Sequence, residues 1–128
     1  MQFAKNVFRL SVLAGLCAFS CGANAVLTDG EMIIVHPFQW TYDNIAKECK
    51  EVLGPKGYDG IQISQPAEHL DKRSEGNPWW AVYQPVNFEN FSTMTGNETQ
   101  LRNMIKACNE AGVKVFADAV FNQMCLVK

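Results

Sequence analysis

The sequence lacks several short motifs by which common enzyme classes are detected. Gly54, Gly57 and Gly60 do not form a G-x-G-x-x-G run, and no G-x-S-x-G stretch occurs. A phosphate-binding loop and the nucleophile elbow of a serine hydrolase are therefore not indicated. The two histidines, His36 and His69, are not spaced with cysteines or carboxylates in the way that zinc ligands are. These absences argue against nucleotide-, serine- and zinc-dependent chemistry.

Clustered positive charge is also absent. The 11 Lys and Arg residues are scattered along a chain of 128 residues, and the formal net charge is −2. Binding to nucleic acid or to an anionic membrane surface depends on a basic patch. The sequence therefore predicts neither of these partners.

No apolar run is long enough to span a membrane, but one near the N-terminus fits a secretory leader. Lys5 and Arg9 precede the run LSVLAGLCAF at residues 10–19, and Ala-Asn-Ala at residues 23–25 provides a small-residue cleavage site. A membrane span needs about 20 apolar residues, whereas a shorter run behind basic residues is typical of a signal peptide. We therefore predict that residues 1–25 are removed. The mature chain of residues 26–128 is then secreted and has no membrane attachment.

The cysteine count leaves one thiol unmatched in the predicted mature chain. Cleavage removes Cys17 and Cys21, so that Cys49, Cys108 and Cys125 remain. Disulfides persist in the oxidising environment outside the cell. Three cysteines allow at most one bridge within the chain, and the count alone does not say which pair forms it.

Three apolar stretches have the length and composition of buried strands. They are Met32–Val35, Tyr58–Ser64 and Val113–Phe121. Their apolar residues are mostly continuous rather than alternating, which is typical of a parallel sheet that is buried on both faces.

Two amphipathic helices are predicted between these strands. Thr41 is a suitable N-cap for the first helix, which Gly54 ends, and Asn97 with Gln100 resembles a capping box before the second, which Gly112 ends. The apolar stripes of the two helices are Ile45, Cys49, Val52 and Leu53, and Leu101, Met104, Ile105 and Cys108. Both stripes have helical spacing.

The order of the predicted elements indicates an α/β fold. Strand, helix, strand, long loop, helix and strand imply a parallel sheet with right-handed crossovers. Ligands of such sheets bind outside the carboxyl ends of the strands. That edge would carry His36, the loop of residues 65–96, and then Asp118, Asn122 and Gln123. A loop of about thirty residues in a compact domain is usually functional.

The long loop is rich in aromatic residues. Its segment NPWWAVYQPVNFENF, at residues 77–91, contains five aromatic side chains. Trp and Tyr rings beside amide groups suit a sugar, because the apolar faces of a pyranose stack on the rings and its hydroxyl groups pair with the amides. The same composition is also consistent with rings that are packed beneath the loop.

A catalytic pair of carboxylates is not evident. Retaining glycoside hydrolysis uses two carboxyl groups about 5–5.5 Å apart. Asp118 is the only acid predicted at the end of a strand. The acids of the loop are interpreted as solvated surface groups: Glu68, Asp71, Glu75 and Glu89.

Several motifs in order resemble those at the start of an α-amylase of glycoside hydrolase family 13, most closely of its animal-type branch. The motifs are IIVHPFQW, IAKECKEVLGPKGYDGIQIS, PWWAVYQPV, NETQLRNMIKACNEAGVKV and DAVFNQM, and they span residues 31–125. The resemblance implies a secreted hydrolase that cuts internal α-1,4 bonds of starch, glycogen and maltooligosaccharides with retention. It also implies that this chain is the first three β/α units of a (β/α)₈ TIM barrel, which is incomplete here.

The resemblance also implies roles for individual residues. Trp79 and Trp80 match a pair of sugar-stacking tryptophans, Tyr83 matches the tyrosine that stacks at the bond being cut, and Gln84 matches its hydrogen-bonding neighbour. Asn122 matches an asparagine that binds calcium through its side-chain oxygen, a ligand that suits this cation. Calcium is thus an implied cofactor, and chloride is a second ion implied for the full-length enzyme.

Three further positions match structural residues of the family, and one position departs from the family pattern. Asp118 matches an acid that supports the site, and Cys49 and Cys108 match a pair that is bridged in the animal enzymes. Gln123 stands where the family has a histidine that contacts the sugar at the cleavage site. An uncharged amide keeps a hydrogen-bond donor there but is not protonated near neutral pH.

The catalytic acids of the family would lie beyond the third strand, outside this chain. We therefore expect an N-terminal fragment of an α-amylase that carries sugar-binding and calcium-site residues and is inactive alone. The alternative is a small secreted carbohydrate-binding module that uses the aromatic loop without catalysis.

Overall fold

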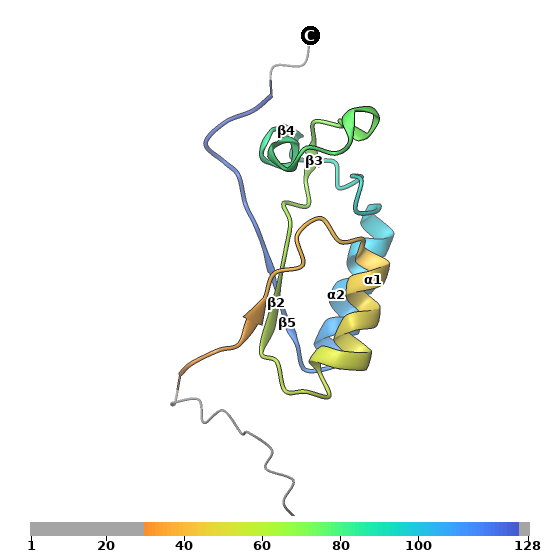
Figure 1. The fold of residues 1–128 in the computed structure, drawn as a ribbon, viewed down its shortest axis with the longest axis vertical. Coiled ribbons are helices and arrows are strands. Elements are labelled where there is room, and N and C mark those ends of the chain that lie inside the picture. Colours follow the sequence, from red (N-terminus) through yellow and green to blue (C-terminus); the bar gives the residue numbers. More distant parts are fainter. Residues whose placement is uncertain (1–29, 126–128) are drawn as a thin grey trace, which may run out of the picture.

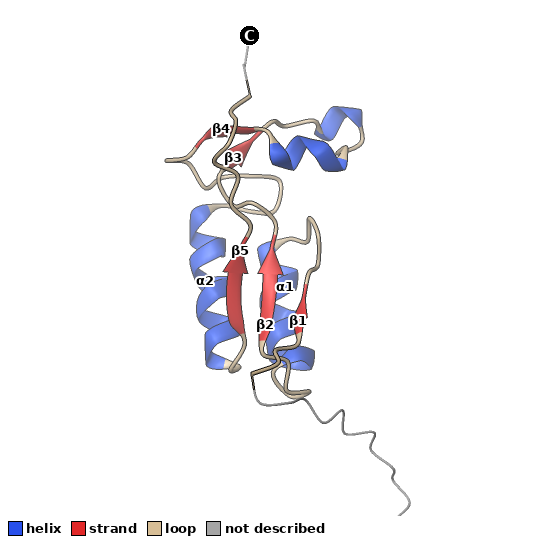
Figure 2. Cartoon of the chain, turned by 90° about the vertical axis from the view of Figure 1, so that its left-hand side faces the viewer, coloured by secondary structure: helices blue, strands red, loops and turns tan. Residues whose placement is uncertain are grey.

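A three-stranded parallel sheet forms the base of the fold. The computed structural model describes residues 30–125, so the predicted signal peptide lies outside the described residues. Strands β1 (Ile34–Val35), β2 (Gly60–Ile63) and β5 (Lys114–Ala117) lie in the order β1-β2-β5. Both pairings are parallel, so the three carboxyl ends meet at one edge (Figure 2). The predicted parallel sheet is confirmed.

The strands are shorter than the apolar stretches that predicted them. Strand β5 stops at Ala117 rather than Phe121, because Ala117 is in register with Ile63, the last residue of β2. After that point only the Asp118 N–H continues the pairing, donating to the Ile63 carbonyl at 3.1 Å. A strand needs a neighbour for its hydrogen bonds, so residues 118–125 leave the sheet as an irregular segment.

The first helix is capped as predicted but changes its geometry midway. Helix α1 (Tyr42–Glu48) begins with the Thr41 hydroxyl accepting a hydrogen bond from the Asn44 N–H at 3.4 Å. It continues as the π-helical turn η1 (Cys49–Leu53). Ile45, Cys49 and Leu53 of the predicted stripe are buried, whereas Val52 is only half-buried.

The second helix, α2 (Glu98–Glu110), has the predicted capping box. The Asn97 Oδ1 accepts from the Gln100 N–H, and the Gln100 Oε1 accepts from the Asn97 N–H, both at 3.0 Å. Two N–H groups that the helix itself leaves unpaired are thereby satisfied. The Gly112 turn then leads into β5, with a backbone φ of 80° that glycine adopts without strain.

Both helices lie on the same side of the sheet (Figure 1). The opposite face carries no helix within residues 30–125, as the view onto the strands shows (Figure 2). On the strands, Phe116 is 38% exposed and Ile34 is 45% exposed. The expectation of a sheet buried on both faces is therefore wrong for the described residues, because both of the helices that could cover it pack against one face.

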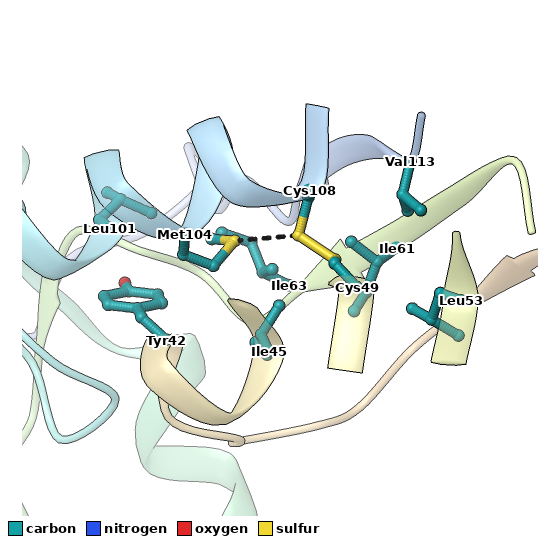
Figure 3. Close-up of a cluster of buried hydrophobic side chains, with 10 residues drawn as sticks. All are labelled: Tyr42, Ile45, Cys49, Leu53, Ile61, Ile63, Leu101, Met104, Cys108 and Val113. Carbon is teal, nitrogen blue, oxygen red and sulfur yellow. Dashed lines mark hydrogen bonds between the residues drawn. A yellow bond between two sulfur atoms is a disulfide. The ribbon is translucent and has the colours of Figure 1, made fainter. Parts of the chain in front are cut away.

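A disulfide lies in the core between the helices and the sheet. Cys49 and Cys108 are bonded, and both are fully buried. The Sδ atom of Met104 lies 3.8 Å from the Cys108 Sγ (Figure 3). Because a disulfide sulfur carries no hydrogen, this approach is a van der Waals contact rather than a hydrogen bond. The predicted pairing is confirmed, and Cys125 is a free cysteine.

The loop of residues 65–96 contains short elements that its sequence did not predict. Strands β3 (Glu68–His69) and β4 (Pro85–Asn87) pair antiparallel, and between them lie the 3₁₀ helices η2 (Arg73–Glu75) and η3 (Trp79–Tyr83). Strands of two or three residues are too short to show a hydrophobic period. These elements sit beyond the carboxyl ends of β2 and β5 (Figure 1). None of the helices in residues 30–125 has the length and apolar character that crossing a membrane would require.

Candidate functional site

The chain after β1 is tied to the end of β2. The Gln39 N–H donates to the Ser64 hydroxyl at 2.8 Å, and Ser64 directly follows the last residue of β2. Gln39 has a backbone φ of 58°, which is uncommon for a residue other than glycine. This bend and its hydrogen bond hold the segment of residues 36–40 at the carboxyl edge of the sheet.

The helix η3 presents two tryptophans to solvent. It starts after Pro78, whose extended backbone precedes the first helical residue. Trp79 is 66% exposed and Trp80 is 38% exposed, whereas Ala81 and Val82 of the same helix are buried. The small buried side chains anchor the turn, and the two large rings remain available for contacts with another molecule.

Four rings form a row that crosses two distant segments of the chain. Tyr83 lies 6.2 Å from Phe38, with 18° between the rings, and 6.3 Å from Trp79, with 69° between them. Phe38 in turn lies 5.7 Å from His36 in an edge-to-face arrangement. These distances and angles are typical of favourable aromatic pairs. Sequence reasoning assigned no ring contact to Phe38, although its position directly after β1 pointed to this edge.

The backbone beside Tyr83 is held by the β3–β4 hairpin. The Leu70 N–H donates to the Gln84 carbonyl at 3.0 Å. Gln84 is half-buried, and within residues 30–125 its side-chain amide makes no hydrogen bond. That amide therefore keeps both its donors and its acceptor next to the ring row.

The segment after β5 returns to the same place. The Gln123 amide nitrogen donates to the Tyr83 carbonyl at 2.9 Å. Two residues later, the Cys125 N–H donates to the Pro85 carbonyl at 2.8 Å. The predicted substrate-binding residues Tyr83, Gln84 and Gln123 are thus brought together from the loop and the C-terminal segment.

No cluster of carboxylates accompanies the predicted calcium ligand within residues 30–125. Asn122, the predicted ligand, is exposed. Calcium takes six to eight oxygen ligands, and no group of three or more His, Cys, Asp or Glu side chains within residues 30–125 is placed to hold a metal ion. A single amide oxygen does not make a binding site for this ion.

The aromatic residues of the motif at residues 77–91 divide into two groups. Trp79, Trp80 and Tyr83 belong to the exposed η3 helix, but Phe88 packs near Phe121 with the rings 6.0 Å apart. Phe88 and Phe91 help to line an apolar hollow of about 260 Å³ at the ends of β2 and β5. The five rings therefore do not form one binding surface.

The acids of the loop lie at the surface, with one exception. Asp71 is paired with Arg73, and hydrogen bonds from Arg73 hold the pKa of the Asp71 carboxyl below its usual range. Glu75 is paired with Lys72, and Glu89 is exposed. Glu68 differs from the prediction because it is half-buried in β3, where its carboxylate accepts a hydrogen bond from the Asn90 amide at 2.9 Å.

His69 is the buried titratable group of this region. It is 6% exposed, and its Nδ1 lies 3.1 Å from the Ala67 carbonyl. Its Nε2 is buried without a hydrogen-bond partner in the described part of the chain. Burial lowers the pKa of His69 below its ordinary value, and the Ala67 carbonyl opposes this shift in part.

Comparison with known proteins relates this chain to α-amylases. It is 50% identical over 121 residues to an α-amylase of Aeromonas hydrophila, a match that covers 94% of this chain and 26% of that protein. It is 50% identical over 97 residues to an α-amylase of Oryzias latipes, covering 76% of this chain and 19% of the relative. No family model matches the sequence.

A solved structure shows the same relation in three dimensions. The α-amylase I of Eisenia fetida, crystallised with maltohexaose, is 41% identical to this chain and superimposes on it with a TM-score of 0.68. The match covers 73% of this chain but 18% of that structure. The chain therefore spans about a quarter or less of the length of the relatives that it matches.

Proposed function

This chain is homologous to part of the α-amylases, and we propose that it forms the N-terminal, sugar-binding part of such an enzyme. The complete enzyme would hydrolyse internal α-1,4 bonds of starch, glycogen and maltooligosaccharides with retention. In this proposal, β1, β2 and β5 are the first three strands of a (β/α)₈ barrel. The bare face of the sheet would then point towards the interior of the complete barrel.

The ring row is the observation that carries the proposal. His36, Phe38, Tyr83 and Trp79 meet at the carboxyl edge of a parallel sheet, which is where α/β barrels bind their substrates. Aromatic faces next to an unpaired amide suit a glucan, which is apolar on its ring faces and polar at its rim. The complex of the Eisenia fetida relative with maltohexaose supports the same class of ligand.

The predicted stacking, hydrogen-bonding and calcium-binding residues have separate roles in this proposal. Trp79 and Trp80 provide exposed rings on which glucose units stack, and Tyr83 stacks at the bond to be cut. The Gln84 amide hydrogen-bonds to a sugar hydroxyl, since it has no partner within residues 30–125. Asn122 supplies one oxygen to a calcium ion whose other ligands come from outside these residues. Chloride, where it is needed, would likewise bind elsewhere in the complete enzyme.

The chain alone is proposed to bind glucan but not to hydrolyse it. Asp118 is the acid at the end of a strand, and retaining hydrolysis needs two carboxyl groups on opposite sides of one bond. Asp71 and Glu75 are held by surface ion pairs, Glu89 is exposed, and Glu68 is held by the Asn90 amide. Errors of about 1 Å in placement cost a hundredfold in rate. We also propose that residues 1–25 direct secretion and are then removed.

Binding of maltoheptaose to the chain is the direct test of the sugar site. We expect saturable quenching of tryptophan fluorescence, and we expect Trp79→Ala to weaken binding by about tenfold because one stacking ring is lost. Trp40→Ala is the matched control, since Trp40 is similarly exposed at 45% but makes no ring contact with the row. Equal affinity of the two variants would contradict the assignment of the site.

A chimera distinguishes an enzyme part from a free-standing carbohydrate-binding module. Residues 30–125 would replace the matched segment of the Aeromonas hydrophila relative, and starch hydrolysis would be measured with calcium present. The proposal expects an active chimera, because the segment would fit the rest of the enzyme at 50% identity. A chimera that folds and binds maltoheptaose but does not hydrolyse starch would favour the module.

A further inference from the structure

We propose that Gln123 is a positioning residue that holds the Tyr83 ring in place, rather than a group that contacts the sugar. The inference rests on the proposed function, because Tyr83 matters as a stacking surface for glucan. It assigns to the amide at this position a task that is performed before any ligand binds. The carrying contact is the hydrogen bond of 2.9 Å from the Gln123 Nε2 to the Tyr83 carbonyl.

The Tyr83 carbonyl is a group that needs an outside donor. Tyr83 is the last residue of η3, and Gln84 after it has a φ of −118° and a ψ of 77°, so the helix does not continue. Carbonyls at the end of a helix have no partner within the helix. Within residues 30–125, the Gln123 amide donates a hydrogen bond to this carbonyl. The bond therefore caps η3 at the residue that carries the sugar-stacking ring.

A second hydrogen bond joins the same two segments, and we call the two bonds together the clamp. The Cys125 N–H donates to the Pro85 carbonyl at 2.8 Å. The segment of residues 123–125 thus runs beside residues 83–85 and is fixed to it at both ends. The clamp joins the chain after β5 to the loop after β2, two segments that no regular strand pairing connects.

Fixing the Tyr83 carbonyl also restricts where its ring can lie. The hydrogen bond holds the backbone at the end of η3, and the backbone limits the side-chain rotamers that Tyr83 can adopt. The contacts with Phe38 and Trp79 then select among these rotamers. In this orientation the ring lies between Phe38 and Trp79, 6.2 Å and 6.3 Å from them. A ring that is held in its bound position binds without first being ordered, which increases affinity.

Only a side chain with a donor can perform this task. The amide of glutamine is uncharged and keeps its N–H groups at every ordinary pH, whereas a carboxylate would face the carbonyl with a second acceptor. Gln123→Met keeps the length of the side chain and removes the donor. The swap Gln123→Met with Met124→Gln keeps the composition and moves the amide by one residue, to a side chain that is 55% exposed. Met124→Leu is the control for the segment.

The experiment combines two readouts on the full chain. The first is the NMR chemical shift of the Tyr83 ring protons without ligand, which depends on the neighbouring rings of Phe38 and Trp79. The second is the dissociation constant for maltoheptaose. We expect Gln123→Met and the swapped variant to move the Tyr83 ring signals towards values of an exposed tyrosine. We also expect both to weaken binding by about three- to tenfold, the worth of one hydrogen bond, while Met124→Leu changes neither readout.

Other outcomes would overturn the inference in distinguishable ways. Weaker binding with unchanged Tyr83 ring signals would mean that Gln123 touches the sugar directly. Unchanged signals and unchanged binding would mean that the clamp has no role. If the unsubstituted chain does not bind maltoheptaose at all, the proposed function fails for this chain. The ring signals then decide by themselves whether Gln123 positions Tyr83.

Discussion

The helix-covered sheet and the loop region above it are held together by different interactions. In the first, Ile61, Ile63 and Met104 are fully or almost fully buried around the disulfide (Figure 3). In the second, short elements are joined by single hydrogen bonds, and the buried Gln65 and His69 keep side-chain atoms without a partner within residues 30–125. The first region leaves one such atom, the Tyr42 hydroxyl, without a partner in the described residues, whereas the second leaves three.

This difference separates stability from binding. Buried apolar surface stabilises a fold without specifying a ligand, so the sheet and its helices act as a scaffold. Unpaired buried polar atoms cost free energy unless water or another group satisfies them. Apart from the Tyr42 hydroxyl of α1, those within residues 30–125 lie in the region that carries the exposed rings. We therefore expect substitutions between the sheet and its two helices to have large effects on stability. Substitutions in the loop region should have large effects on sugar binding.

The disulfide gives the largest expected effect on stability. The Cys49→Ser, Cys108→Ser double variant should lose about 4 kcal/mol of unfolding free energy, because the bridge closes a loop of sequence separation 59 in the unfolded chain. Urea unfolding of the two forms measures the difference. Cys125→Ser, which removes the free thiol, should change stability little, and a comparable loss there would contradict the pairing.

The two faces of the sheet should respond unequally to truncation. Met104→Ala, in the fully buried core, should cost about 2–5 kcal/mol through lost burial and a residual cavity. Phe116→Ala removes a larger side chain but from the bare face, where it is 38% exposed, and should cost less. If both variants lost the same unfolding free energy in urea, the bare face would have to be covered in solution. That result would contradict the difference between the two faces.

The capping box tests a local interaction within the scaffold. Asn97→Ala removes the acceptor for the Gln100 N–H and should destabilise the chain by about 1 kcal/mol. Asn103→Ala, at an exposed position inside α2, should be neutral or slightly stabilising because alanine favours a helix interior. Thermal unfolding of the two variants provides the measurement. A reversed order would mean that the cap contributes nothing.

The smallest expected effect is a pH dependence from His69. Burial lowers its pKa in the folded chain below the ordinary value of 6.5, so well above that pH both states are neutral and no stability is lost. As the pH falls below 6.5, the unfolded chain takes up a proton first, and the free energy of unfolding decreases. His69→Gln should flatten this part of the profile. Equal slopes for the unsubstituted chain and His69→Gln would rule out this source.

The scaffold was predictable from sequence, and the loop was not, for physical reasons. Helix periods, the Asn97 cap and the apolar runs carry local signals, and the resemblance supplied the pairing of Cys49 with Cys108. The end of β5 at Ala117 depended instead on where β2 stops, which no property of the run Val113–Phe121 reveals. The ring contact of Phe38 with Tyr83 likewise joins residues from distant segments.

The same limit applies to the candidate site. The residues Trp79, Trp80, Tyr83 and Gln84 were expected at one edge, and the structure brings them there with Gln123. The hydrogen bond of the Gln123 amide was not predicted, because it joins residues 40 positions apart and neither residue is unusual in composition. Similarly, the split of the five loop aromatics follows the position of β4, since three of them precede this strand in η3 and two follow it.

Maltoheptaose binding and starch hydrolysis, measured on one preparation of residues 26–128, show together whether this chain binds glucan without cleaving it. The account predicts saturable binding that Trp79→Ala weakens, together with no release of reducing sugar from soluble starch when calcium is present. Hydrolysis that persists through purification to homogeneity and disappears in Asp118→Asn would contradict the account, because it would place the chemistry within this chain.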